Sequence, residues 1–241
     1  ISPSVLKAQL PDSLEVAIKS ILDENGSAGR SSKTFLADSL NVIRFLDKAT
    51  EFQSIDSDSA YKYSEKALGL TLKTRSLALL SMSLESVGAY CLNHEMYSES
   101  MSYFLRSLTI EEKRGDLHRM ADVYDNLGLV YYYLEVFDKS LGYHQKALDI
   151  YNRQNDTTGI SKALSHLGTL HSSREFCEKR TKEEKLLDFQ TAIDYYEQSL
   201  ELCSLQGDQD RVAKNNQDIA AVYNKLEKPQ TALTYVLKAL E

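Results

Sequence analysis

The sequence predicts an all-α protein, an α-solenoid of about five helical hairpins preceded by an N-terminal capping helix. Three observations predict this class. Residue patterns recur every 40 positions, which is typical of stacked supersecondary units. Apolar residues within each repeat follow helical spacing. Proline and glycine, which interrupt helices, number only 3 and 10 in 241 residues, so few breaks are expected inside the helices.

Two series of small residues mark the repeat. The first series consists of Gly88, Gly128 and Gly168, which lie 40 residues apart, followed by Ala220. The second series consists of Ala60, Ser100, Ser140, Ala192 and Ala232. Each of the first four members of the second series is followed 28 residues later by a member of the first. Such constant spacing predicts nested two-helix units, in which helix A carries the first series and helix B the second.

Helix A and helix B are both predicted from apolar periodicity. Tyr124, Leu127 and Tyr131 follow the i, i+3, i+7 spacing of one helix face. The connectors between units are short: "KRGD" at 113–116, "RQND" at 153–156 and "LQGD" at 205–208. Their Asp residues suit the start of a helix, and Gly suits a left-handed helix end.

These residues resemble the tetratricopeptide repeat over about residues 33–241. The 40-residue period is similar to the long variant found in kinesin light chains and in bacterial signalling and regulatory proteins. The resemblance implies a right-handed solenoid in which helices A and B cross closely at Gly88, Gly128, Gly168 and Ala220. Two departures stand out. The first helix A, around Phe45, Ala49 and Phe52, matches loosely and is best aligned with a shift of one residue. Asn216 stands where a large apolar residue is expected.

The repeat spacing divides the chain into segments. We expect a capping helix and connector over 1–30, and repeats at about 34–70, 76–115, 116–155, 156–207 and 208–241. The N-terminal helix, residues 11–25, is expected to pack on the first repeat and cover its apolar face. Twelve extra residues near 176–188 predict lengthened helices that project from the stack. The alternative for this insertion is a solvated loop without a role.

Composition excludes several classes of function. The formal charge of −7 gives no basic surface for nucleic acid. No apolar run reaches the roughly 18 residues that a membrane span needs, so we expect no membrane contact. Three scattered cysteines predict neither disulfides nor a zinc site. They favour a cytoplasmic location, with the periplasmic sensor region of a membrane protein as the alternative.

No catalytic motif, cofactor site or metal site is recognisable, so we predict that the chain is not an enzyme. His144 and His171 take packing positions of the repeat, and Cys91 takes the position of a core aromatic residue. An enzymatic alternative would need chemistry from His166 and His171.

The resemblance implies that helix A lines a concave groove that binds a peptide or protein. Residues at offsets −6, −3, −2, +1, +4 and +5 from the crossing residue are expected to project into it. From Gly88 these are Met82, Glu85, Ser86, Ala89, Leu92 and Asn93. The full set of favoured contacts is Asp122, Asp125, Asn126, Leu129, Tyr132, Tyr133, Asn93, His166, Lys162 and Asn224. The alternative is a groove that holds only water or the chain's own flanking helix.

Surface binding, rather than chemistry, is therefore the predicted activity. We predict a non-catalytic protein–protein or peptide interaction module, the sensory or regulatory region of a larger bacterial signalling protein. The sequence ends in "LKALE", inside a helical pattern, so we expect a fused C-terminal output domain beyond Glu241. The alternative is a structural adaptor or self-assembling scaffold, for which a homodimer is the simplest form.

Overall fold

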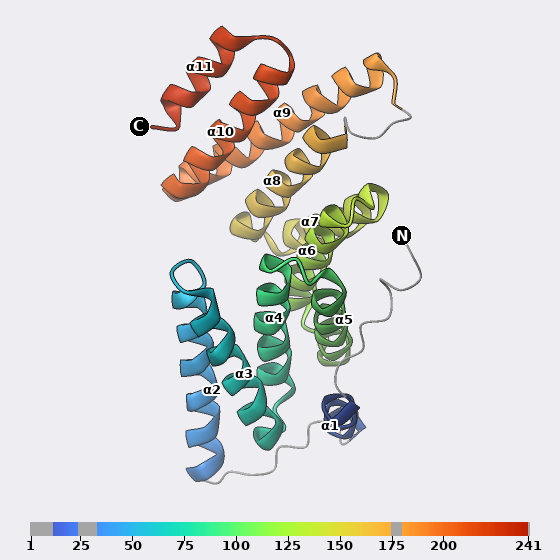
Figure 1. Cartoon of the computed structure of the whole chain (residues 1–241), viewed down its shortest axis with the longest axis vertical. Coiled ribbons are helices and arrows are strands. Elements are labelled where there is room, and N and C mark those ends of the chain that lie inside the picture. Colours follow the sequence, from blue (N-terminus) through green and yellow to red (C-terminus); the bar gives the residue numbers. More distant parts are fainter. Residues whose placement is uncertain (1–11, 24–32, 175–179, 241) are drawn as a thin grey trace. The chain divides into compact units, whose positions relative to one another are not determined.

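The computed structural model describes residues 12–23, 33–174 and 180–240, and every regular element in these ranges is a helix (Figure 1). The chain forms two compact units, residues 1–130 and 131–241. The boundary between the two units falls inside one helix, α6 (Leu117–Tyr133).

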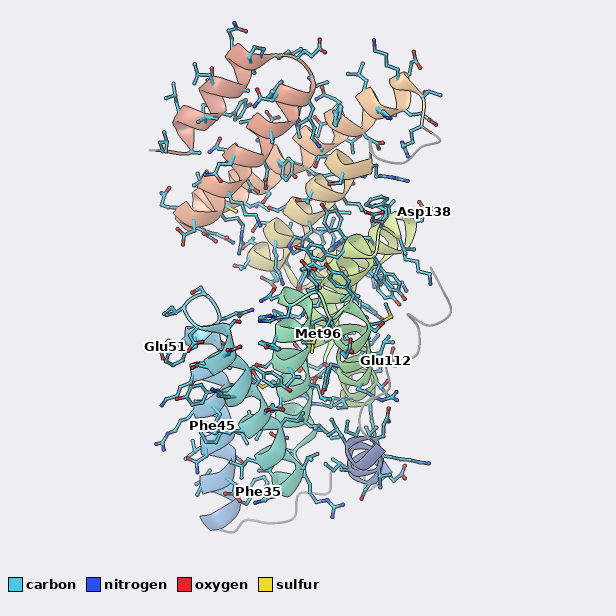
Figure 2. The ribbon with its side chains drawn as sticks, viewed as in Figure 1. Phe35, Phe45, Glu51, Met96, Glu112 and Asp138 are labelled. Carbon is cyan, nitrogen blue, oxygen red and sulfur yellow. The ribbon has the colours of Figure 1, made fainter. Side chains whose placement is uncertain are left out.

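The first unit contains two complete hairpins. Its helices before α6 are α1 (Asp12–Asp23), α2 (Lys33–Phe52), α3 (Ser57–Thr74), α4 (Leu77–Asn93) and α5 (Tyr97–Arg114). Helix α2 packs on α3, and α4 packs on α5, as antiparallel neighbours. Phe35 and Phe45 lie along α2 (Figure 2), and the Phe45 ring stacks on Tyr63 of α3 at 6.2 Å between ring centroids.

The second unit continues the same pattern. Its helices are α7 (Phe137–Gln154), α8 (Thr157–Ser173), α9 (Lys182–Gln206), α10 (Gln209–Lys225) and α11 (Pro229–Lys238). Helix α8 packs on α9, and α10 packs on α11. The predicted all-α architecture of repeated hairpins is confirmed. Within the described parts of the chain, no helix combines the length and the apolar character needed to cross a bilayer.

Helices A and B meet at the predicted small residues. A methyl group built on Gly88 would lie 2.9 Å from Cε1 of Phe104 in α5, closer than a real methyl carbon approaches another atom. The Ser100 hydroxyl donates a hydrogen bond of 2.9 Å to the Gly88 carbonyl, and Phe104 is fully buried. In the second unit, a methyl on Gly168 would lie 2.8 Å from the Tyr196 ring of α9. The contact that requires glycine is therefore an aromatic ring of helix B.

The connectors between repeats end and start helices as predicted. Asn155 and Gly207 have positive φ angles of 55° and 73°, which end α7 and α9 in the left-handed conformation. The carboxylates of Asp116, Asp156 and Asp208 then accept hydrogen bonds of 3.2, 3.0 and 3.0 Å from backbone N–H groups in the first turns of α6, α8 and α10. These caps satisfy donors that a helix start otherwise leaves unpaired.

The N-terminal helix packs on the first repeat, as expected, and also reaches the second. Ile18 and Ile21 of α1 pack in one cluster with Leu68 of α3, Leu84 of α4 and Ile110 of α5. Helix α1 thus lies across the B helices of the first two hairpins, where its two isoleucines are buried.

One apolar face of α2, the A helix of the first repeat, is exposed. Leu36, Leu40 and Ile43 of α2 are 61%, 47% and 41% exposed. The one-residue shift expected in this helix is also visible, since Ala49 is buried while Lys48, at the 40-residue spacing, is exposed.

The 12-residue insertion lengthens only one of the two helices beside it. Helix α8 has 17 residues, the same length as α4, α6 and α10, whereas α9 has 25 against the 18 of α3, α5 and α7. Thr181 starts α9 with a capping box. The Thr181 hydroxyl accepts a hydrogen bond from the backbone N–H of Glu184, and the Glu184 carboxylate accepts one from the backbone N–H of Thr181. The expected lengthening of α8 was therefore wrong. Residues 175–179, at the start of the insertion, lie outside the described residues.

Substituting Gly88 by alanine should lower the free energy of unfolding by roughly 1–2 kcal/mol, because the buried Phe104 ring must move. The matched substitution is Gly69→Ala in α3 of the same unit, where nothing lies within 4 Å of the added methyl group. Gly69→Ala should raise the free energy of unfolding by roughly 0.5–1 kcal/mol through helix propensity alone. Urea unfolding followed by circular dichroism measures both, and an equal stabilisation by the two substitutions would contradict the packing account.

Candidate functional site

A pocket of about 260 Å³ lies in the first unit, among α2, α3, α4 and α6. One face of α4 forms its longest wall, through residues at the offsets −6, −3, −2, +1 and +5 from Gly88. These wall residues are Met82, Glu85, Ser86, Ala89 and Asn93. The 3.6-residue period of the helix places these residues on one face of α4, whereas Gly88 faces the partner helix α5.

The other walls combine apolar and polar groups. Leu46 and Ala49 of α2 and Ala60 of α3 supply apolar surface. Gln53 in the turn after α2, Ser57 at the start of α3 and Asn126 of α6 supply polar side chains. With Asn93, three amide groups therefore line the space. Side-chain amides carry both donors and acceptors, which is what the backbone of an extended peptide needs from a binding site.

Glu85 is the buried charge of this pocket, with a side chain only 12% exposed. Its Oε1 accepts hydrogen bonds from the Ser81 and Ser107 hydroxyls at 3.2 and 3.0 Å, and the Arg119 guanidinium lies 3.4 Å away. Burial raises the pKa of Glu85 to about 7, while Arg119 and the two hydroxyls oppose that rise. The carboxyl group therefore changes its protonation near neutral pH.

The second unit holds a separate pocket of about 270 Å³, lined by Tyr132, Tyr133, Glu135, Phe137 and Ser173. The Tyr132 ring lies 5.2 Å from Tyr133 and 6.2 Å from Phe137, with interplanar angles of 72° and 61°. The hydroxyls of Tyr132 and Ser173 are hydrogen-bonded at 2.9 Å. The neighbouring Tyr131 is buried against Tyr143 instead, so the three consecutive tyrosines have different surroundings.

Four of the sequence-predicted contact residues line one of these two pockets. Asn93 and Asn126 lie in the first-unit pocket, and Tyr132 and Tyr133 lie in the second-unit pocket. Asp122 is close to the first pocket, 3.8 Å from Arg119.

The remaining predicted residues are placed differently. Asp125 is fully buried, so its side chain is not exposed in a groove. Leu129, Lys162 and His166 are half-buried, and the His166 ring packs 5.2 Å from the buried His144. Asn224 is exposed on α10 and lines neither of the two pockets.

Several lining residues were not expected from the sequence. Arg119 lies nine positions before Gly128 and Phe137 nine positions after it, outside the offsets considered. Gln53 and Ser57 come from the loosely matching first hairpin. Glu135 lies in the turn after α6, with a positive φ of 58°. Offsets along helix A do not apply to Gln53, Ser57 and Glu135, because each occupies a turn or a first helical turn.

Comparison with known proteins gives a family match over part of the chain and a fold match over most of it. The model of the tetratricopeptide repeat family matches residues 120–153. No curated protein matches the sequence.

The fold is similar to several solved structures. BtubC (BKLC) from P. vanneervenii has a TM-score of 0.66 and 20% identity, covering 94% of this chain and 89% of its own. The Podosopora anserina putative kinesin light chain with nearly identical TPR-like repeats has a TM-score of 0.59 and 12% identity, covering 82% and 92%. A Rap protein complexed with competence and sporulation factor has a TM-score of 0.58 and 12% identity, covering 95% and 70%.

The substitution Glu85→Gln should change how stability depends on pH. Because the folded chain holds a proton on Glu85 up to about pH 7 and an unfolded chain releases it near 4.5, the wild type loses stability as pH rises through this window. The wild type's free energy of unfolding, relative to Glu85→Gln, should fall by up to about 3 kcal/mol between pH 4 and 8. Urea unfolding of both proteins across this range measures it. A difference that stays constant with pH would show that Glu85 titrates as an ordinary exposed carboxyl group.

Proposed function

We infer that this chain, an α-solenoid of tetratricopeptide repeats, is a non-catalytic module that binds a peptide or protein segment in the pocket of its first unit. The observation that supports this most is the composition of that pocket. Apolar surface from Leu46, Ala49 and Met82 lies beside the amides of Asn93 and Asn126. Apolar surface with polar groups placed beside it is the usual chemistry of a binding site.

The pocket suits an extended segment better than a compact small molecule. Its amides come from the turn after α2, the end of α4 and the middle of α6, so they are spread along the walls and can pair with successive peptide groups. The half-buried Ala89 leaves room beside Gly88 for a partner side chain to approach the helix. A Rap protein of similar fold has been solved in complex with competence and sporulation factor, which supports the same use of the fold here.

We propose further that the module is the sensory or regulatory region of a larger bacterial signalling protein, cytoplasmic or periplasmic. In that arrangement a fused output domain would respond to occupation of the pocket. The long repeat, which resembles that of bacterial regulatory proteins, supports this assignment.

A structural adaptor or self-assembling scaffold is the second candidate, and one feature of each unit favours it. Helix α2 exposes Leu36, Leu40 and Ile43, and α11 exposes Leu233 and Leu237, at 58% and 54%. Apolar stripes of this kind mark interaction surfaces. Light scattering coupled to size exclusion separates the candidates, since a monomer at all concentrations would count against the scaffold.

Selection from a random dodecapeptide library displayed on phage should enrich sequences that bind the wild type. Ala89→Arg, which places a long cation inside the pocket, should weaken binding of the enriched peptides at least about tenfold, because the added side chain competes with them for the pocket. The matched control is Thr109→Arg on the exposed side of α5, which adds the same charge to the same unit outside the pocket. Fluorescence polarisation with synthesised peptides gives the affinities.

Equal affinity of wild type and Ala89→Arg would place binding elsewhere on the molecule and contradict the proposed pocket. An equal loss in Thr109→Arg would show that added charge, rather than the filled pocket, weakens binding.

A further inference from the structure

The second-unit pocket has the form of an aromatic cage. The Tyr132 ring meets the rings of both Tyr133 and Phe137 edge to face, and all three line the pocket. Rings at such angles form walls of different orientation around one space. The hydrogen bond from Tyr132 to Ser173 holds the central wall in place, because it ties the end of α6 to the end of α8. A rigid cage loses little entropy when a ligand enters.

The charge around this cage favours a cation. Aromatic faces are negative, so three of them together attract a positive group. Glu135 lines the same pocket and adds a full negative charge. The Arg174 guanidinium, next to Ser173 in the chain, is offset by an ion pair of 3.1 Å with Asp138, which lies at the start of α7 (Figure 2).

The chain's own lysines already use neighbouring aromatic faces in this way. The Lys139 ammonium lies 5.0 Å from the centroid of the Tyr131 ring, and the Lys146 ammonium lies 5.2 Å from that of Tyr143. Both rings lie outside the cage. Both distances from ammonium to ring centroid are within the roughly 6 Å of a cation–π contact, so such contacts occur beside the cage.

We propose that the cage formed by Tyr132, Tyr133 and Phe137 binds a methylated ammonium group. A volume of about 270 Å³ leaves room for a compact head group. Methylation favours binding because a lysine ammonium is strongly hydrated and must shed water to meet the rings. Aromatic cages are the known solution for quaternary ammonium recognition in general.

The group could be carried by a trimethyl-lysine side chain of a partner or by a free quaternary amine. Only the trimethyl-lysine source rests on the proposed function, because a protein partner would then contact the cage as well as the first-unit pocket. The pocket of the first unit plays no part in the chemistry of the cage, so the two proposals fail independently.

The test titrates four probes against the full chain by isothermal calorimetry and ligand-observed NMR. Two probes are cations: choline and the tripeptide acetyl-Gly-Lys(trimethyl)-Gly-amide. Two are uncharged isosteres: 3,3-dimethyl-1-butanol and the same tripeptide with a tert-butyl carbon in place of the ammonium. Each cation should bind at least about fivefold more tightly than its isostere. Tighter binding of the trimethylated tripeptide than of choline would identify a protein source, and tighter binding of choline would identify a small-molecule source.

Variants then assign the binding to the cage. Tyr133→Ala should weaken binding of the tighter-binding cation at least about fivefold. Glu135→Gln should weaken its binding about two- to fivefold and make the affinity less dependent on salt. Tyr235→Ala in α11, which removes another tyrosine of the same unit outside the pocket, should change the affinity by less than about twofold. Circular dichroism checks that each variant is folded.

Three results would overturn the proposal. The first is an isostere that binds as tightly as its cation. The second is full affinity in a folded Tyr133→Ala variant. The third is equal affinity for the trimethylated tripeptide and for the same tripeptide with an unmethylated lysine, which is titrated as a reference.

Discussion

The rest of the structure depends on one contact, the aromatic ring of a B helix lying against a glycine of its A helix. Phe104 on Gly88 and Tyr196 on Gly168 are the two clear examples. A ring placed there brings the helices close enough for the Ser100 hydroxyl to reach the Gly88 carbonyl. Because the crossing buries one side of each A helix, the opposite side of α4 is left to form a wall of the first-unit pocket.

Much of the fold could be predicted from the sequence because the chain repeats its packing rule every 40 residues. Asp156, for example, was expected to start a helix, and it does. Turns from helix A to helix B were harder to predict. Glu95 and Glu135 adopt positive φ angles of 60° and 58°, which glutamate rarely does. The turn is held by the bond from the Met96 N–H to the Cys91 carbonyl, a Schellman-type closure that side-chain identity does not reveal.

The candidate site could be predicted where it lies on a regular helix and not elsewhere. Spacing from Gly88 and Gly128 was enough to nominate Asn93 and Asn126, which line the first-unit pocket. Asp125, three residues before Gly128, was also nominated by this spacing but is buried, because the packing around equivalent positions differs from one repeat to the next. Glu135 sits in a turn, where helical spacing has no meaning. Helix α1 was expected to pack on the first repeat, but its contacts with α4 and α5 were not predicted, because its apolar residues could pack against any exposed face.

The most direct test of the central contact is a double-mutant cycle between Gly88→Ala and Phe104→Leu. If the ring is what excludes a methyl group, shortening Phe104 should relieve most of the cost of alanine at position 88. The two substitutions should then couple by about 1 kcal/mol or more in the free energy of unfolding. Additivity within about 0.5 kcal/mol would contradict the account, because glycine would then be required for a reason unrelated to the ring.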